Sequence, residues 1–226
     1  MQYLLDTADL ESIKRAYDIF PMSGVTTNPT IISKEKKEFL QILKDIRNII
    51  GEDSMLHAQV LGTKAEQMVE EAEYLNECIG GNLYVKIPVI PEGIKAMKIL
   101  KSKNMKITAT AVITPQQALI AAIAGAEYVA PYINRIDNIS GNGVKVVSEI
   151  VELFKIHSID AKVLAASFKN VQQVHSIALC GSQSATINPE IMEKLLDHPL
   201  TDWSVNQFIS DWESVYGKGK TTLEAK

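Results

Sequence analysis

The sequence predicts an α/β fold, a single-domain (β/α)8 TIM barrel with an extra C-terminal helix. Eight short runs rich in Val, Ile, Leu, Ala and Thr recur along the chain. Segments with helical periodicity and charged faces separate these runs. The length of 226 residues lies near the low end for a compact barrel of this type.

Strands that alternate with helices indicate a parallel sheet, because each parallel pair needs a crossover connection. The strand-like runs occupy residues 2–8, 24–28, 55–61, 83–89, 106–112, 127–133, 162–168 and 184–187. Helical periodicity is clear in residues 8–20, 64–79, 91–104 and 170–181. An open doubly wound sheet is the alternative, but no G-x-G-x-x-G motif follows any of the runs. No linker divides the chain, so residues 1–226 are interpreted as one domain.

The segment beyond the eighth run predicts a helix over about residues 201–216. Phe208, Trp212 and Tyr216 fall four residues apart and share one helical face. Two interpretations stay open: the stripe packs on the protein's own barrel, or it reaches a neighbouring subunit. The polar tail, residues 217–226, is expected to be mobile.

Composition places the chain among ordinary globular proteins, with 46% apolar and 22% charged residues. A net charge of -4 gives no electrostatic reason to expect nucleic acid or an anionic membrane as partner. The longest apolar stretch, "QALIAAIAGA", is too short to span a bilayer, and the N-terminus does not resemble a signal peptide. We therefore expect a cytoplasmic protein with no nucleic-acid partner and no membrane association.

Cysteine and histidine spacing predicts no metal site. Cys78 and Cys180 lie far apart and form no C-x-x-C motif, which suits two reduced thiols in the cytoplasm. The four histidines never fall at metal-ligand spacing. We expect no metal ion.

A lysine interrupts the fourth strand-like run. Lys86 lies in the middle of "NLYVKIPVIPEG", although burying an unpaired ammonium is costly or forces the loss of its proton. Alternate strand residues face opposite sides, and Leu83, Val85, Ile87 and Val89 suit the side that packs on helices. Lys86 is therefore predicted to point into the barrel.

The same parity argument predicts inward polar residues in six other runs. These residues are Asp6, Thr26, Asn28, Gln59, Thr108, Thr110, Tyr132 and Ser167. Residues of the other parity are expected to face the helices, including Ala109 and Ala111 in the fifth run and Leu164 and Ala166 in the seventh. The inward groups should converge on the barrel mouth, where barrel enzymes carry out their chemistry.

Structural explanations stay open for single residues. Thr26, Thr108 or Thr110 could each make a structural hydrogen bond, and Asp6 could belong to a buried ion pair. A ring of polar groups around one lysine is harder to explain by packing, because each group adds a desolvation cost. A lysine in a confined, poorly hydrated site has a lowered pKa, and its neutral amine can form a Schiff base with a ketone or aldehyde.

Several blocks of the sequence resemble the transaldolase family, and specifically its fructose-6-phosphate aldolase branch. The blocks are "LDTAD", "GVTTNPTII", "VKIPV", "AGAEYVAPYINRID" and "KVLAASFKN", and the resemblance runs from residue 3 to about residue 216. It implies a cofactor-free class I aldolase barrel that acts on sugar phosphates. It also implies a homo-oligomer, in which rings of five subunits pair into ten.

The resemblance implies roles for the residues around the lysine. Lys86 would be the Schiff-base lysine, and Asp6 the acid that positions and tunes it. Thr26 and Asn28 would hold the hydroxyl groups of the dihydroxyacetone part of the substrate.

The resemblance also implies the groups that move protons and bind phosphate. Tyr132 would do the acid/base work, with a water held by Gln59 and Thr110. Arg135 and Ser167 would bind the phosphate of the aldehyde half, for which a guanidinium fork and a hydroxyl are suitable ligands.

Two positions separate the branches of the family. True transaldolases resemble "AEV" and "PF" where this chain has Gln59 in "AQV" and Tyr132 in "PY". A tyrosine hydroxyl can help to release the three-carbon enamine as free dihydroxyacetone, whereas a phenylalanine cannot. We therefore predict a fructose 6-phosphate aldolase. The alternatives are a transaldolase and a non-catalytic sugar-phosphate-binding barrel, and Lys169 is the rival lysine.

Overall fold

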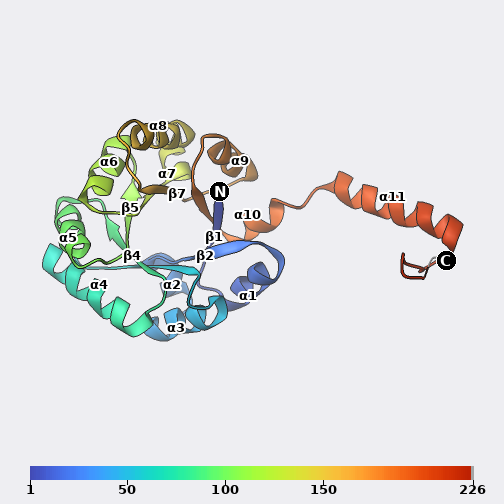
Figure 1. Cartoon of the computed structure of the whole chain (residues 1–226), viewed down its shortest axis with the longest axis horizontal. Helices are drawn as coiled ribbons and strands as arrows, with labels where there is room; N and C mark the ends of the chain where they lie inside the picture. The colour runs from blue at the N-terminus through green and yellow to red at the C-terminus, as the bar shows by residue number, and fades with distance from the viewer. Residues whose placement is uncertain (225–226) are drawn as a thin grey trace. The chain divides into compact units, whose positions relative to one another are not determined.

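The computed structural model describes residues 1–224, and eight parallel strands in sequence order form a closed barrel (Figure 1). Each strand pairs with the next, and β8 pairs with β1 to close the barrel. This arrangement confirms the predicted fold class. The strands are β1 (Gln2–Asp6), β2 (Met22–Thr26), β3 (Met55–Gln59), β4 (Leu83–Pro88), β5 (Ile107–Val112), β6 (Tyr128–Pro131), β7 (Lys162–Ala165) and β8 (Ser184–Ile187).

Helices α1 to α9 connect the strands and surround the barrel (Figure 1). Most of the long helices begin at a proline or at a polar side chain that caps the first turn. The helices are α1 (Leu10–Ile19), α2 (Pro29–Lys34), α3 (Phe39–Ile50), α4 (Ala65–Ile79), α5 (Pro91–Ser102), α6 (Pro115–Ala124), α7 (Ile133–Asp137), α8 (Gly143–Ile156), α9 (Val171–Leu179), α10 (Pro189–Lys194) and α11 (Pro199–Tyr216).

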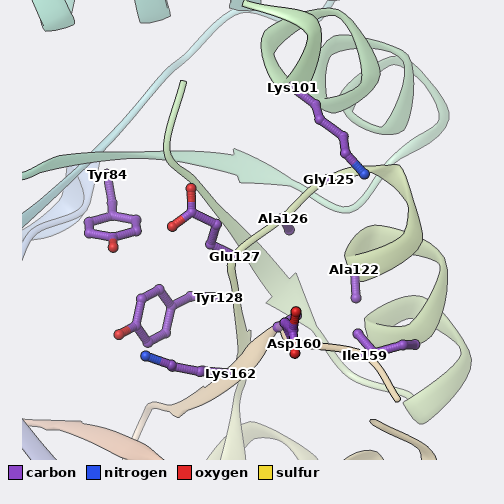
Figure 2. A pocket seen from close by; sticks show the side chains of 11 residues that line it. Tyr84, Lys101, Ala122, Gly125, Ala126, Glu127, Tyr128, Ile159, Asp160 and Lys162 are labelled. Atoms are coloured by element: carbon purple, nitrogen blue, oxygen red, sulfur yellow. The ribbon is translucent and has the colours of Figure 1, made fainter. Parts of the chain in front are cut away.

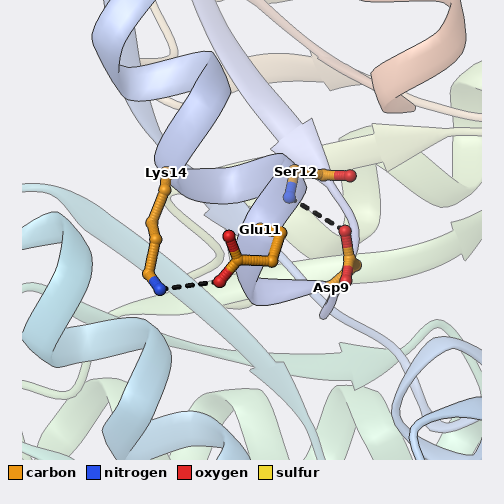
Figure 3. Close-up of polar contacts among 4 residues, drawn as sticks. All are labelled: Asp9, Glu11, Ser12 and Lys14. Atoms are coloured by element: carbon orange, nitrogen blue, oxygen red, sulfur yellow. Dashed lines mark hydrogen bonds and ion pairs between the residues drawn. The ribbon is translucent and has the colours of Figure 1, made fainter.

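The start of α1 shows how local sequence sets a helix boundary (Figure 3). The backbone N–H of Ser12 donates to a carboxylate oxygen of Asp9 at 2.9 Å, so Asp9 caps the helix. Lys14 and Glu11 form an exposed ion pair at 2.7 Å on the same turn. Exposed ion pairs of this kind contribute little stability, so the Asp9 cap is the interaction that marks the start of the helix.

The barrel interior below the cavity is filled by a layer of large side chains. Leu4, Met55, Tyr84, Tyr128 and Leu164 form one buried cluster, although they come from five different strands around the barrel. Side chains from such distant strands can meet only inside the barrel, where layers of side chains form a packed core. The barrel is therefore closed at this level, and its open cavity lies at the C-terminal ends of the strands.

The chain divides into two compact units, the barrel unit Met1–Ile191 and a second unit that begins at Met192. The second unit contains α11, which starts two residues before the expected helix. The tail from 217 that was expected to be mobile includes residues 225–226, which lie outside the described residues. Its described part contacts α11, because the indole Nε1 of Trp212 donates to the carbonyl oxygen of Lys220 at 3.0 Å.

Two features are absent from residues 1–224. No helix there is long and apolar enough to cross a membrane. No group of three or more His, Cys, Asp or Glu side chains in this range could hold a metal ion, and Cys78 and Cys180 are free thiols.

Candidate active site

A cavity of about 360 Å³ at the C-terminal ends of the strands brings together all the predicted site residues except Thr110. The site residues that line it are Asp6, Thr26, Asn28, Gln59, Lys86, Tyr132, Arg135 and Ser167. The cavity therefore combines an amine, a carboxylic acid, a phenol and a guanidinium at the end of the barrel where catalysis takes place in this fold.

Lys86 lies at the floor of this cavity and is only 6% exposed. Its Nζ donates to the main-chain carbonyl oxygen of Thr27 at 2.7 Å. Burial lowers the pKa of Lys86, while the charge of Asp6 acts in the opposite direction. Within residues 1–224, Lys86 has no ion-pair partner. An amine of this kind is more readily available in its neutral, nucleophilic form.

Asp6 is held by a short chain of hydroxyl groups. Thr26 Oγ1 donates to Asp6 Oδ1 at 2.7 Å, and it lies 2.6 Å from Thr186 Oγ1. Burial raises the pKa of Asp6, whereas Lys86 and the bond from Thr26 act to lower it. A raised pKa makes a carboxylic acid better able to hold and donate a proton.

Sequence reasoning missed Thr186, which lines the cavity from β8. The signal was present, because Thr186 and Ser184 alternate with the aliphatic Ala185 and Ile187 as in the other strands.

Tyr132 and Thr110 share a hydrogen bond of 2.9 Å between their hydroxyl groups, so Thr110 contacts the site through the tyrosine. Tyr132 follows β6, and Arg135 lies one turn later in α7. The Arg135 guanidinium lies 4.5 Å from the centre of the Tyr132 ring, a cation–π geometry that holds the charge beside the cavity.

Asn28 caps the short helix α2 at the edge of the cavity. Its side-chain oxygen accepts from the backbone N–H of Ile31 at 3.0 Å. The amide N–H groups of Asn28 are then the part of the side chain that can donate to a ligand.

The seventh strand does not follow the predicted parity. Leu164 and Ala166, predicted to face the helices, both line the cavity, and Leu164 also belongs to the interior layer. The prediction was wrong because this strand contributes apolar residues to the barrel interior, so polarity does not mark its inward side. Ser167 also lines the cavity, because its positive φ of 65° breaks the alternation after Ala166.

The fifth strand departs from the predicted parity at its end. Ala111, predicted to face the helices, lines the cavity with a φ of 60°. The pairing of β5 with β6 shifts register between Ala109 and Val112, as in a β-bulge. Two non-glycine residues with positive φ, Ala111 and Ser167, therefore lie at the same site, where backbone strain is often found.

Thr108 does not line the cavity but belongs to a buried layer beneath it. His57 Nδ1 and Thr108 Oγ1 lie 2.9 Å apart, and the His57 ring stacks on Tyr84 with centroids 4.8 Å apart. Burial, together with the charge of Lys86, lowers the pKa of His57 well below its ordinary value. The imidazole beneath the lysine is therefore neutral.

Lys169, the rival lysine, is exposed and does not line the cavity. Its backbone N–H donates to Gln173 Oε1 at 2.8 Å, next to the start of α9.

A second cavity of about 440 Å³ lies near the N-terminal ends of β4, β6 and β7 (Figure 2). Tyr84 and Tyr128 lie on one side of it, with Ala122 and Ile159 on the other (Figure 2). None of the predicted site residues lines this cavity. Catalytic groups in this fold lie at the other end of the strands, so the cavity around Lys86 is the candidate active site.

Comparison with known sequences identifies close relatives. A profile of the family described as "Transaldolase/Fructose-6-phosphate aldolase" matches residues 3–222. A protein of Clostridioides difficile (strain 630) described as "Probable transaldolase" is 41% identical over 213 residues, which cover 94% of this chain and 97% of that protein.

Solved structures with similar folds are more distant in sequence. A structure described as "Native KDPGal structure" has a TM-score of 0.57 at 15% identity, covering 83% of this chain and 85% of its own. Dihydrodipicolinate synthase from Rhodopseudomonas palustris has a TM-score of 0.60 at 11% identity, covering 96% of this chain and 79% of its own. At such identities the likeness concerns the barrel fold alone.

Proposed function

Because the chain belongs to the transaldolase/fructose-6-phosphate aldolase family, we propose that it is a class I aldolase that cleaves or forms fructose 6-phosphate. Membership in this family indicates an enzyme that acts on sugar phosphates. The observation that carries the proposal is Lys86, a buried amine with a lowered pKa that lines a cavity together with Asp6 and Tyr132.

In the first half of the reaction, the neutral amine of Lys86 attacks the ketone carbon of fructose 6-phosphate and forms a carbinolamine. Loss of water then gives an iminium ion, with Asp6 placed to supply or accept the proton. The hydroxyl next to the breaking carbon–carbon bond gives up its proton, and the bonding electrons move to the iminium nitrogen. The products are glyceraldehyde 3-phosphate and an enamine on Lys86.

In the second half, the enamine carbon takes a proton and water hydrolyses the new iminium ion, which releases dihydroxyacetone and restores the amine. The Tyr132 hydroxyl, hydrogen-bonded to Thr110, suits this proton transfer, and Gln59 and Thr110 would hold the water that relays it. Asn28 and Thr26 would bind the dihydroxyacetone hydroxyls. Arg135 and Ser167 would bind the phosphate of the aldehyde.

A transaldolase that transfers the dihydroxyacetone unit to another sugar phosphate is the second candidate. The description of the Clostridioides difficile relative as a probable transaldolase favours it. Gln59 and Tyr132 favour the aldolase, because a hydroxyl beside the enamine can supply the proton that releases the three-carbon unit without an acceptor.

Two measurements test the proposal. Incubation with fructose 6-phosphate and no acceptor aldehyde should release free dihydroxyacetone, and absence of release would favour the transaldolase. Reduction with borohydride in the presence of dihydroxyacetone should add the three-carbon unit to Lys86, located by mass spectrometry. Lys86→Ala should abolish both signals, whereas Lys169→Ala, the matched control, should retain them. Label on Lys169, or an unlabelled protein, would overturn the mechanism.

We also propose that the protein is a homo-oligomer, a pentamer or decamer, in which α11 contacts a neighbouring subunit. Within its own compact unit no residue of α11 is buried, and Phe208 is 70% exposed. Trp203, Val205 and Ile209 add to this exposed apolar surface. An apolar surface of this size on one helix is typical of a protein interface.

A further inference from the structure

Thr27 connects the candidate nucleophile to the strand beside it. The carbonyl oxygen of Thr27 accepts a hydrogen bond from Lys86 Nζ at 2.7 Å, and Thr27 is only 1% exposed. The backbone N–H of Thr27 and its Oγ1 both donate to the carbonyl oxygen of His57, at 2.8 and 2.9 Å. The acceptor for the lysine is thus anchored twice to β3.

We propose that Thr27 is a positioning residue for Lys86: its main-chain carbonyl aims the lysine nitrogen, and its hydroxyl holds that carbonyl in place. The inference deepens the proposed function and rests on it, since it assumes that Lys86 is the nucleophile. Neither parity nor any motif assigned a role to Thr27, because the group that contacts Lys86 belongs to the main chain.

At every stage of the reaction the Lys86 nitrogen carries at least one N–H group that can donate to the Thr27 carbonyl. A neutral amine has two N–H groups, whereas the carbinolamine and the protonated iminium each have one. A single carbonyl oxygen can therefore accept one N–H throughout. In the amine this hydrogen bond leaves the nitrogen lone pair outside the bond and free to attack, and in the iminium the carbonyl dipole stabilises the buried positive charge.

Two adjacent residues, Thr26 and Thr27, give Asp6 and Lys86 separate hydrogen-bond partners. The Thr26 side chain holds Asp6, and the Thr27 carbonyl holds Lys86. Because each group has its own partner, Asp6 and Lys86 need not form an ion pair. No ion pair joins them within residues 1–224. An ion pair would keep the amine protonated, whereas a neutral carbonyl can bind it in either protonation state.

A merely structural role for the Thr27 hydroxyl predicts a different result. In that case, loss of the hydroxyl changes the free energy of unfolding. A variant that still folds then keeps the pH dependence of adduct formation at Lys86. The charged and titratable groups near Lys86 are Asp6 on β1, Tyr132 after β6, Arg135 on α7 and the buried His57 on β3. All of them are unchanged in variants at Thr27, so a shift in pH dependence reports on the Thr27 contact.

The experiment measures the rate of dihydroxyacetone addition to Lys86 under cyanoborohydride as a function of pH, together with kcat and KM. Thr27→Val keeps the branched shape but loses the hydroxyl, and Thr27→Ser restores it. We expect Thr27→Val to slow trapping roughly tenfold, as a small misplacement of a reacting group does, with a lower kcat and little change in KM. The midpoint of its pH profile should move to lower pH, because a looser carbonyl stabilises the ammonium form less.

The controls separate the possible outcomes. Thr27→Ser should behave like the wild type, and so should Thr63→Val, the same substitution at an exposed site. Thr27→Ala replaces Thr27→Val if the valine variant does not fold. A wild-type protein without a Lys86 adduct overturns the proposed function, and with it this inference. A wild-type adduct combined with a folded Thr27→Val variant of unchanged rate and midpoint overturns the role of Thr27 alone.

Discussion

At the scale of single residues, the state of Lys86 and Asp6 follows from burial. Removal from water disfavours the charged form of each group, and their mutual attraction only partly offsets this effect. The pKa of the lysine is lowered and that of the acid is raised. Schiff-base formation requires a neutral amine at its start, so the lowered pKa of Lys86 prepares the nucleophile.

Asp6→Asn tests this electrostatic coupling. The Asp6 charge raises the pKa of Lys86, so its removal should lower that pKa further. The amine then loses its proton at lower pH, and the acid limb of the trapping rate should move to lower pH while the maximal rate falls. The pH profile of adduct formation measures the shift. Asp160→Asn, at an exposed carboxylate in the other cavity, is the control. A limb that stays in place would show that Asp6 does not tune the lysine.

Tyr132→Phe tests the branch of the family. The variant loses the hydroxyl that bonds Thr110 at 2.9 Å and keeps the ring that contacts Arg135. Release of free dihydroxyacetone should fall on the order of a hundredfold, because proton delivery to the enamine is lost. Transfer to an acceptor aldehyde should fall less, because the enamine carbon then attacks the acceptor carbonyl and does not need that proton. Parallel assays with and without acceptor measure the ratio, and equal losses would remove the argument for the aldolase.

At the scale of elements, the register of three strands builds the layer under the lysine. Lys86 pairs with Gln59 on β3 and with Thr108 on β5, while His57 pairs with Tyr84, two residues before the lysine. The His57–Thr108 hydrogen bond therefore joins the two strands that flank β4. His57 Nε2 is buried and has no hydrogen-bond partner within residues 1–224, which makes protonation of this ring costly.

This layer predicts a loss of stability in acid. His57 has a lowered pKa in the folded protein, so below the ordinary value of 6.5 the unfolded chain binds a proton that the folded protein does not. The free energy of unfolding should fall as the pH falls below that value, by up to about 2 kcal/mol over one to two pH units.

His57→Phe should remove this part of the pH dependence. Urea unfolding at neutral and mildly acidic pH measures it, and the variant should show a smaller difference between the two conditions even if its absolute stability is lower. The comparison His175→Phe replaces a histidine at an exposed position of α9. An unchanged acid dependence in His57→Phe would show that other groups cause it.

At the scale of the whole molecule, the two units differ in how their apolar residues are covered. The barrel unit has a buried core of large aliphatic side chains, whereas no residue of α11 is buried. The hydrophobic effect favours covering such a surface, and a second copy of the chain is the partner that the proposed oligomer supplies.

Phe208→Asp should weaken that assembly. A carboxylate placed in an apolar interface loses its hydration, and the aromatic contact area is lost as well. Light scattering coupled to size-exclusion chromatography should show a smaller particle than the wild type, with unchanged far-ultraviolet circular dichroism. Ser210→Asp, on the same helix but outside the apolar stripe, should keep the wild-type mass. An oligomer that is insensitive to Phe208→Asp would place the interface elsewhere.

The sequence by itself determined the barrel and most of the cavity lining. The alternation of short aliphatic runs with amphipathic helices has few compact solutions, and the two-residue period of a strand indicated which way Lys86, Asp6 and Gln59 point. This two-residue period was a weaker guide where polarity did not mark the inward side. It placed Leu164, Ala166 and Ala111 on the wrong face, because apolar packing and positive φ values are not visible in a pattern of side chains.

Only the tertiary structure decided which groups touch. The Thr27 carbonyl under Lys86, Thr186 beside Thr26, and Tyr132 bonded to Thr110 each join residues far apart in the chain. Strand register and barrel closure set these contacts, and both depend on the packing of the whole chain. A main-chain acceptor such as Thr27 carries no signal in residue type, because every residue has a carbonyl group. Its position beneath the lysine is therefore a property of the fold.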